Sequence, residues 1–173
     1  AGTPGISDAG EVLVQKCYEA GIKVTSLPGP AACITALTMS GLSTRRFAFE
    51  AFLPADKKQR AQILEELQDE TRTIILYEAP HHLVKTLEEL FKTLGSRKVR
   101  ICRELTKKHE TGYADTLDGA LAHYRDIEEP RGECVIIIEG ADREDLNKQK
   151  QQSWEEMTIE EHMALYEDMN RKD

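Results

Sequence analysis

The sequence is poor in aromatic residues and contains no long apolar run. Phe, Trp and Tyr make up 6% of its 173 residues, which disfavours a site built as a large aromatic-lined cleft. No apolar stretch approaches the ~20 residues that span a bilayer, so we expect no membrane contact. With 40% hydrophobic and 31% charged residues, the composition instead indicates a soluble globular protein.

The sequence also lacks a cysteine or histidine pattern typical of a metal site. Its four cysteines form no CxxC pair, and each lies among apolar neighbours: Cys17, Cys33, Cys102 and Cys134. The histidine pair His81-His82 has no further Cys or His at ligand spacing. We therefore predict buried free thiols, no metal, and a reducing, cytoplasmic location.

Basic residues are outnumbered by acidic ones. The chain has 23 Lys and Arg against 31 Asp and Glu, a net charge of -8. Residues 141–173 hold ten acidic and five basic side chains, or -5, which leaves -3 for the remainder. This balance excludes a protein that coats nucleic acid by bulk charge, although a local basic patch remains compatible with it. Lys57, Lys58 and Arg60 form one such patch, which either contacts RNA or is a solvated helix face.

Helix and strand patterns alternate along most of the chain. Helical periodicity covers residues 11–20, 31–40, 56–69, 80–94 and 116–125. Strand patterns cover residues 23–27, 46–53, 71–77, 98–104, 111–114 and 133–139. This alternation predicts an α/β fold with a mixed sheet flanked by helices.

Some side chains can be assigned to the inner sides of these helices. In the 80–94 helix we expect Leu83, Leu87, Leu90, Phe91 and Leu94 to face the core. In the 11–20 helix, Val12, Val14 and Cys17 supply the apolar contacts.

The character of the sequence changes after Gly140. Residues 142–152 are charged and rich in glutamine, which is typical of a linker. Thr158 begins a capping box, so we expect a last helix from there.

Two turns rich in glycine, proline and alanine precede helices. The first covers residues 1–10, and the second covers residues 27–32. Small residues let main-chain amides approach a ligand closely. Together the two turns predict one wall of a small-molecule site.

Six blocks of this sequence resemble a known family in order and spacing. The blocks are AGTPGISD, LPGPAA, FEAFLP, ILYEAPHH, CRELTKKHE and RGECVIIIEG. They resemble the tetrapyrrole (corrin/porphyrin) methylase superfamily, and within it the bacterial 16S ribosomal RNA cytidine-2′-O-methyltransferases. That family has two α/β domains with S-adenosylmethionine bound between them.

The resemblance also implies a domain organisation. Residues 1–43 would be the remnant of an N-terminal methylase domain together with the inter-domain helix. Residues 44–140 would be a complete second domain, and residues 141–173 an acidic linker and the start of a helical C-terminal extension. The family's first strand and glycine-rich loop have no counterpart here, so we expect an N-terminally truncated chain.

Cofactor contacts follow from the same resemblance. In the first turn they would be Gly2, Thr3, Pro4 and Ile6, and in the second turn Ala31 and Ala32. At the end of one strand they would be Tyr77 and Glu78, and at the start of the last strand Gly132, Glu133 and Cys134. The superfamily often has Asp where this chain has Thr3. Each stretch also has a purely structural explanation, as a turn, a helix packing site or the end of a strand.

The RELTK block is the candidate catalytic segment. Arg103 and Lys107 provide two cations, and Glu104 provides a carboxylate, directly after a core strand. Such a group could hold an RNA phosphate and assist removal of a proton from a ribose hydroxyl. Glu104 would be the base or its orienting partner, although a salt-bridged strand end would have the same sequence.

The expected function is therefore 2′-O-methylation of a cytidine ribose in 16S rRNA of the 30S subunit, with S-adenosylmethionine as cofactor. The resemblance implies a homodimer. Two alternatives remain: a tetrapyrrole or corrin methyltransferase, or a dimerisation or binding piece that is inactive by itself. If the N-terminal half of the site is missing, this chain alone would bind the cofactor poorly and be inactive.

Overall fold

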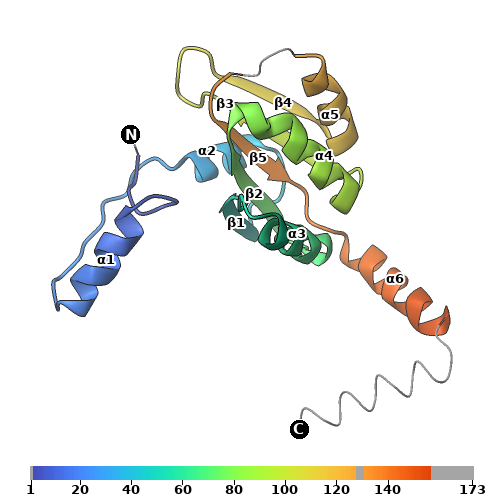
Figure 1. The fold of residues 1–173 in the computed structure, drawn as a ribbon, viewed down its shortest axis with the longest axis horizontal. Coiled ribbons are helices and arrows are strands. Elements are labelled where there is room, and N and C mark those ends of the chain that lie inside the picture. The colour runs from blue at the N-terminus through green and yellow to red at the C-terminus, as the bar shows by residue number, and fades with distance from the viewer. Residues whose placement is uncertain (1, 128–130, 157–173) are drawn as a thin grey trace, which may run out of the picture. The chain divides into compact units, whose positions relative to one another are not determined.

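The computed structural model describes residues 2–127 and 131–156. The chain divides into two compact units, Ala1–Gly140 and Ala141–Asp173, and Figure 1 shows their elements. The predicted helix after Thr158 lies outside the described residues.

A mixed five-stranded sheet forms the centre of the first unit. Its strands are β1 (Phe47–Phe52), β2 (Thr73–Glu78), β3 (Lys98–Arg103), β4 (Thr111–Thr116) and β5 (Cys134–Ile138). The spatial order is β1-β2-β5-β3-β4. β1 and β2 are parallel, whereas β5 runs antiparallel to both β2 and β3, and β4 runs antiparallel to β3. The α/β class and the mixed sheet are confirmed.

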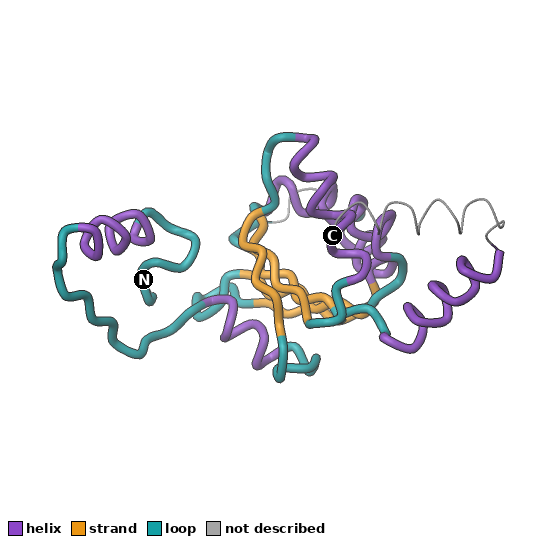
Figure 2. The backbone as a smooth tube through the Cα atoms, turned by 90° about the horizontal axis from the view of Figure 1, so that it is seen from below, coloured by secondary structure: helices purple, strands orange, loops and turns teal. Residues whose placement is uncertain are grey.

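Helices lie on both sides of this sheet (Figure 2). They are α2 (Ala32–Met39), α3 (Lys57–Glu66), α4 (Leu83–Leu94) and α5 (Leu117–Arg125), with α1 (Gly10–Glu19) preceding them. Two short 3-10 turns, η1 (Leu67–Asp69) and η2 (Pro80–His82), follow α3 and precede α4. Local signals set several ends: Asp56 accepts a hydrogen bond from the Gln59 amide at 2.9 Å, and Gly95 ends α4 at a φ of +71°.

Two apolar clusters pack against the opposite faces of the sheet. The α4 face buries residues such as Ile74, Leu76 and Ile136 against α3, α4 and α5. The α2 face buries Ile75, Val135 and Ile137 against α2. Successive side chains of a strand point to opposite faces, so β5, in which all five residues are buried, contributes to both clusters.

Three details of the structure differ from the predictions within unit 1. Residues 23–27 form no strand, because no described strand pairs with them to complete their hydrogen bonds. Phe91 is 36% exposed, whereas Leu83, Leu87, Leu90 and Leu94 of the same helix are buried. Helix α1 has no buried residue, and Val12 and Val14 are exposed.

The predicted linker is instead helical. Helix α6 (Arg143–Glu156) covers most of it. Asp142 accepts hydrogen bonds from the amides of Glu144 (2.7 Å) and Asp145 (3.2 Å), and so caps the helix. Polar pairs one turn apart, such as Lys148 with Asp145 at 3.5 Å, support it. A helix without an apolar stripe gives no periodic pattern in the sequence, so no helix was predicted for this segment.

Three of the four cysteines are buried, as predicted: Cys33, Cys102 and Cys134. Cys17 is half-buried, and all four are free thiols. Over residues 2–127 and 131–156, no helix combines the length and apolar character needed to cross a bilayer.

Candidate functional site

Most of the predicted site residues meet at one edge of the sheet. Cys134, at the start of β5, lies opposite both Glu78 of β2 and Arg103 of β3. The antiparallel direction of β5 therefore places its beginning beside the carboxyl ends of the other two strands. Ligands of open α/β sheets commonly bind at such carboxyl ends.

Tyr77 and Glu78 are neighbours in β2 but face opposite sides of the sheet. Tyr77 packs against the α2-face cluster, together with Ile6, Ala31 and Leu105. Glu78 faces α4, where it hydrogen-bonds Thr86. Predicted cofactor residues from three distant stretches thus converge on the α2 face, whereas the Glu78 side chain does not join them.

The Tyr77 side chain ties β2 to the first turn of α2. Its hydroxyl oxygen accepts a hydrogen bond from the Cys33 amide at 3.1 Å. Its ring contacts those of Phe49 and Phe52 edge-on, with centroids 5.0 and 5.6 Å away. Burial raises the pKa of Tyr77 to about 12, so the hydroxyl stays protonated at neutral pH.

The two small-residue turns lie against each other. The Thr3 amide donates a hydrogen bond to the Pro30 carbonyl at 2.8 Å. A Cβ at Gly29 would lie 2.8 Å from the Thr3 hydroxyl, and one at Gly2 would lie 2.9 Å from the Pro30 oxygen. Gly2 is therefore required by close backbone approach, whereas Gly29 leaves room for the Thr3 hydroxyl.

The remaining residues of these turns differ in exposure. Pro4 and Ala32 are exposed, whereas Ile6 and Ala31 are half-buried. Asp8 closes the first turn, because its carboxylate accepts hydrogen bonds from the Gly5 amide at 3.0 Å and the Gly10 amide at 2.7 Å.

Glu104 and Lys107 form an ion pair directly after β3. The Lys107 ammonium lies 3.0 Å from Glu104 Oε1 and 3.5 Å from Glu133 Oε2. Glu104 Oε1 also accepts the Glu133 amide at 3.2 Å, and the Glu104 amide donates to the Glu133 carbonyl at 3.1 Å. These contacts join the RELTK block to the residues that precede β5.

The backbone at this junction has three residues with positive φ. Glu104 has a φ of +51°, Thr106 of +63° and Gly132 of +85°. A Cβ added at Gly132 would overlap the Glu104 side chain. Gly132 therefore provides both the backbone conformation and the space that Glu104 occupies.

The contact between Glu104 and Lys107 shifts the pKa of both groups. The hydrogen bond from Lys107 lowers the pKa of Glu104, and the same contact raises the pKa of Lys107. At neutral pH the carboxylate of Glu104 is therefore ionised, and the ammonium of Lys107 is charged. The geometry fits Glu104 as a group that orients Lys107.

Arg103 does not join Glu104 and Lys107. Its guanidinium donates to the Thr111 hydroxyl at 3.1 Å and to the Arg131 carbonyl at 3.3 Å. It also lies 5.9 Å from the centroid of the Tyr124 ring. These contacts hold Arg103 on the α4 side of β3.

The Cys134 thiol also lies on the α4 face of the sheet. Its Sγ donates to the Gly132 carbonyl at 3.4 Å. Burial raises the pKa of Cys134 to about 12, so this thiol is protonated at neutral pH.

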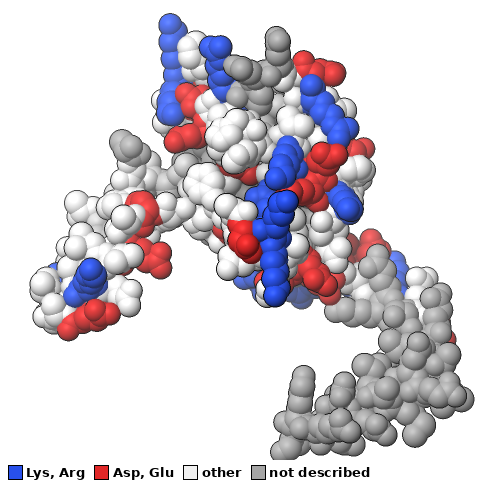
Figure 3. Space-filling model, in the orientation of Figure 1, with Lys and Arg blue, Asp and Glu red and all other residues white. Residues whose placement is uncertain are grey.

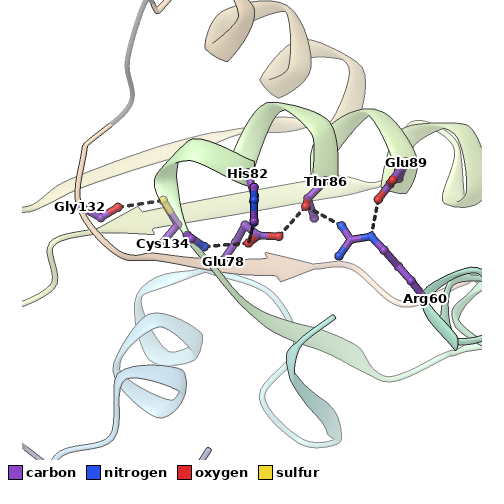
Figure 4. A network of polar contacts seen from close by, with 8 residues as sticks. Arg60, Glu78, His82, Thr86, Glu89, Gly132 and Cys134 are labelled. Carbon is purple, nitrogen blue, oxygen red and sulfur yellow. Dashed lines mark hydrogen bonds and ion pairs between the residues drawn. The ribbon is translucent and has the colours of Figure 1, made fainter. Parts of the chain in front are cut away.

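Glu78 belongs to a polar network that sequence reasoning missed (Figure 4). Besides Thr86, it involves Arg60, which is ion-paired to Glu89 at 2.6 Å with a side chain only 15% exposed. The prediction of a solvated or RNA-binding face for Arg60 is therefore wrong, although Lys57 and Lys58 are exposed. The sequence did contain one sign of this network: Thr86 is a polar residue among the buried leucines of α4.

Charges on the face of the first unit seen in Figure 3 are mixed. Lys and Arg side chains alternate with Asp and Glu and do not gather into one basic patch. Among the described residues, no group of three or more His, Cys, Asp or Glu side chains could hold a metal ion.

Curated relatives resemble the chain over most of its length. It is 50% identical over 146 residues to the ribosomal RNA small subunit methyltransferase I of Synechocystis sp.. It is 48% identical over 150 residues to the protein of the same name from Escherichia coli O157:H7. Each match covers 84% of this chain and 52% of the relative, so the chain spans about half the length of these relatives.

Solved structures share the fold at low sequence identity. The methyltransferase CobJ matches with a TM-score of 0.57 and 20% identity, over 81% of this chain and 62% of that one. Uroporphyrin-III C-methyl transferase from Thermus thermophilus, complexed with S-adenyl homocysteine, matches with a TM-score of 0.54 and 17% identity, over 80% and 62%.

The family model for Tetrapyrrole (Corrin/Porphyrin) Methylases matches residues 1–121. This match covers both small-residue turns and the sheet edge where Tyr77 and Glu104 lie. The chain therefore belongs to the tetrapyrrole methylase family.

Proposed function

We propose that this chain is part of an S-adenosylmethionine-dependent methyltransferase that methylates the 2′-hydroxyl of a cytidine ribose in 16S ribosomal RNA. The observation that carries the proposal is its 50% and 48% identity to proteins named ribosomal RNA small subunit methyltransferase I. The family neighbour complexed with S-adenyl homocysteine supports the choice of cofactor.

The methyl donor would lie against the α2 face of the sheet edge. The turns at Gly2–Ile6 and Ala31–Ala32 would supply main-chain donors and acceptors to it, and Tyr77 would hold α2 in place. The backbone of residues 132–134 would border the same site. Small side chains and free backbone groups suit the polar methionine part of the cofactor.

Lys107 would approach the RNA at this edge. Its charge is fixed by Glu104 and Glu133, which suits contact with a phosphate or with developing negative charge on the ribose oxygen. Glu104 would orient Lys107. Arg103 would support the strand end through Thr111 and Tyr124 and would not contact substrate directly.

The protein would act in the cytoplasm as a homodimer, and its substrate would be the 30S subunit. Methylation of a tetrapyrrole is the second candidate, because solved relatives include uroporphyrin-III C-methyl transferase. The much higher identity to the rRNA enzymes favours RNA.

The deciding experiment is methyl transfer by the purified intact protein, of which this chain is part. It is incubated with labelled S-adenosylmethionine and 30S subunits, and the modified nucleotide is located by mass spectrometry. We expect one methylated cytidine ribose. Transfer to a uroporphyrinogen and none to 30S subunits would instead establish the second candidate.

A further inference from the structure

The Glu78 carboxylate is buried and fully engaged in hydrogen bonds. Glu78 is 5% exposed and Thr86 is 1% exposed. Oε1 accepts the Ala79 amide at 2.8 Å, and Oε2 accepts the Thr86 hydroxyl. His82 Nδ1 lies 4.0 Å from Oε1. A buried carboxylate is costly unless such donors replace water, so these contacts determine where the end of β2 can lie.

Thr86 passes this constraint on to two helices. Its hydroxyl donates to Glu78 and accepts from Arg60 Nη2 at 2.7 Å. The Arg60 Nε in turn donates to Glu89 Oε2 at 2.6 Å. Figure 4 shows the side chains lying in sequence, with Arg60 reaching from α3 to α4. β2, α3 and α4 are therefore linked by one chain of hydrogen bonds.

The chain of contacts continues on the other face of the sheet. Tyr77 immediately precedes Glu78, and its hydroxyl accepts the Cys33 amide in the first turn of α2. Tyr77 and Glu78 are consecutive residues of β2 and both pair with β5, so a shift of this strand end moves both residues. The polar network on the α4 face is thus mechanically connected to the beginning of α2.

Packing alone does not explain a threonine at position 86. The other buried positions of α4 are all leucine: Leu83, Leu87, Leu90 and Leu94. A leucine or valine would bury more apolar surface. It would also remove the hydroxyl that donates to Glu78 and accepts from Arg60. The buried Glu78 carboxylate and the half-buried Arg60 guanidinium would then each lack one partner.

We propose that Thr86 and Arg60 are positioning residues that act through Glu78 on the end of β2, and through Tyr77 on the α2 turn that lines the methyl-donor site. The last part rests on the proposed function. The coupling between Thr86 and α2 does not depend on it.

Hydrogen exchange tests this coupling in the 173-residue chain. Thr86→Val removes the hydroxyl at nearly constant volume, and Thr86→Ser restores it. We expect the Cys33 amide to exchange roughly ten-fold faster in Thr86→Val, relative to the Ile136 amide in the sheet centre. Thr86→Ser should lie near the wild type. Arg60→Met should act in the same direction as Thr86→Val.

Leu94→Ala is the matched control, because it creates a cavity at the other end of α4 without touching the network. If it speeds Cys33 exchange relative to Ile136 as much as Thr86→Val does, the coupling is ordinary destabilisation and the proposal is overturned. An unchanged ratio in Thr86→Val overturns it as well.

Calorimetric titration of the intact protein, of which this chain is part, with S-adenosylmethionine tests the link to the donor site. We expect Thr86→Val to weaken binding by roughly ten-fold and Thr86→Ser to bind as the wild type does. Equal affinity of Thr86→Val and wild type would overturn the link. Changed exchange, together with an intact protein that shows no binding, would support the coupling and count against the proposed function.

Discussion

The hydroxyl of Tyr77 accepts a hydrogen bond from the backbone amide of Cys33, 44 residues earlier in the chain. The first amides of a helix have no partner within the helix, and here a side chain from the sheet supplies one. α2 itself has no side-chain cap. This bond therefore determines where α2 begins relative to β2.

Replacing Tyr77 with phenylalanine should destabilise the protein measurably. The Cys33 amide loses its acceptor in a partly buried place, so we expect the free energy of unfolding to fall by about 1 kcal/mol. Urea denaturation measures the change. Tyr18→Phe, at a 68% exposed position, is the control and should behave like the wild type. Equal stability of both variants would show that water replaces the lost bond.

Gly132→Ala should be more destabilising than Gly41→Ala. Both glycines have positive φ, +85° and +69°, so both variants incur about 1–2 kcal/mol of backbone strain. Only at Gly132 does the added methyl group overlap Glu104, since nothing lies within 4 Å at Gly41. We expect a further loss of about 1–3 kcal/mol for overpacking. Equal unfolding free energies would indicate that Glu104 moves away without cost.

The Glu104–Lys107 pair should contribute to the acid sensitivity of the fold. The hydrogen bond from Lys107 lowers the pKa of Glu104 from its ordinary value of 4.5. A carboxylate with a lowered folded pKa stabilises above its unfolded pKa, and this contribution is lost as the pH falls through the folded pKa.

We therefore expect Glu104→Gln to lose stability at neutral pH and to show a shallower decline below pH 4.5. Lys107→Met should do the same, and the double variant should match either single one, because one interaction is removed in each case. Urea unfolding across the acid range measures this. Additive effects of the two substitutions would show that the ion pair is not formed in solution.

Thiol labelling should distinguish Cys17 from the other cysteines. Cys33, Cys102 and Cys134 are buried, and burial raises the pKa of Cys102 and Cys134, the latter to about 12. With a thiol reagent at about pH 8, we expect rapid reaction of Cys17 alone in the folded protein. All four cysteines should react in denaturant. Rapid labelling of Cys134 in the native state would contradict the packing around β5.

In the intact protein, Glu104→Gln should lower methyl transfer to 30S subunits more than it weakens cofactor binding. Glutamine keeps the side-chain shape but loses the charge that holds Lys107, and misplacement of such a group costs roughly ten- to a hundred-fold in rate. Single-turnover transfer and cofactor titration measure the two effects. Glu133→Gln, whose side chain is 88% exposed, is a milder comparison. Small and equal losses in transfer and binding would remove Glu104 from the mechanism.

Much of the fold was readable from local sequence signals. The predicted strand at 71–77 is β2, and the predicted helix at 80–94 is η2 followed by α4, because apolar spacing, Pro80 and Gly95 act within a few residues. The segment 23–27 has the same local pattern as a strand and does not form one. A strand exists only when another pairs with it, and pairing is decided elsewhere in the chain.

Sequence alone determined the family and the residue types at the site, because motif order and turn chemistry are written in consecutive positions. The tertiary structure decided what each residue does there. In the structure the adjacent residues Tyr77 and Glu78 face opposite sides of the sheet. Arg60 belongs to a polar network between α3 and α4 and not to a surface patch. The side chain of Glu104 packs against Gly132. The physical reason is that these contacts join positions far apart in the chain, so no local pattern encodes them.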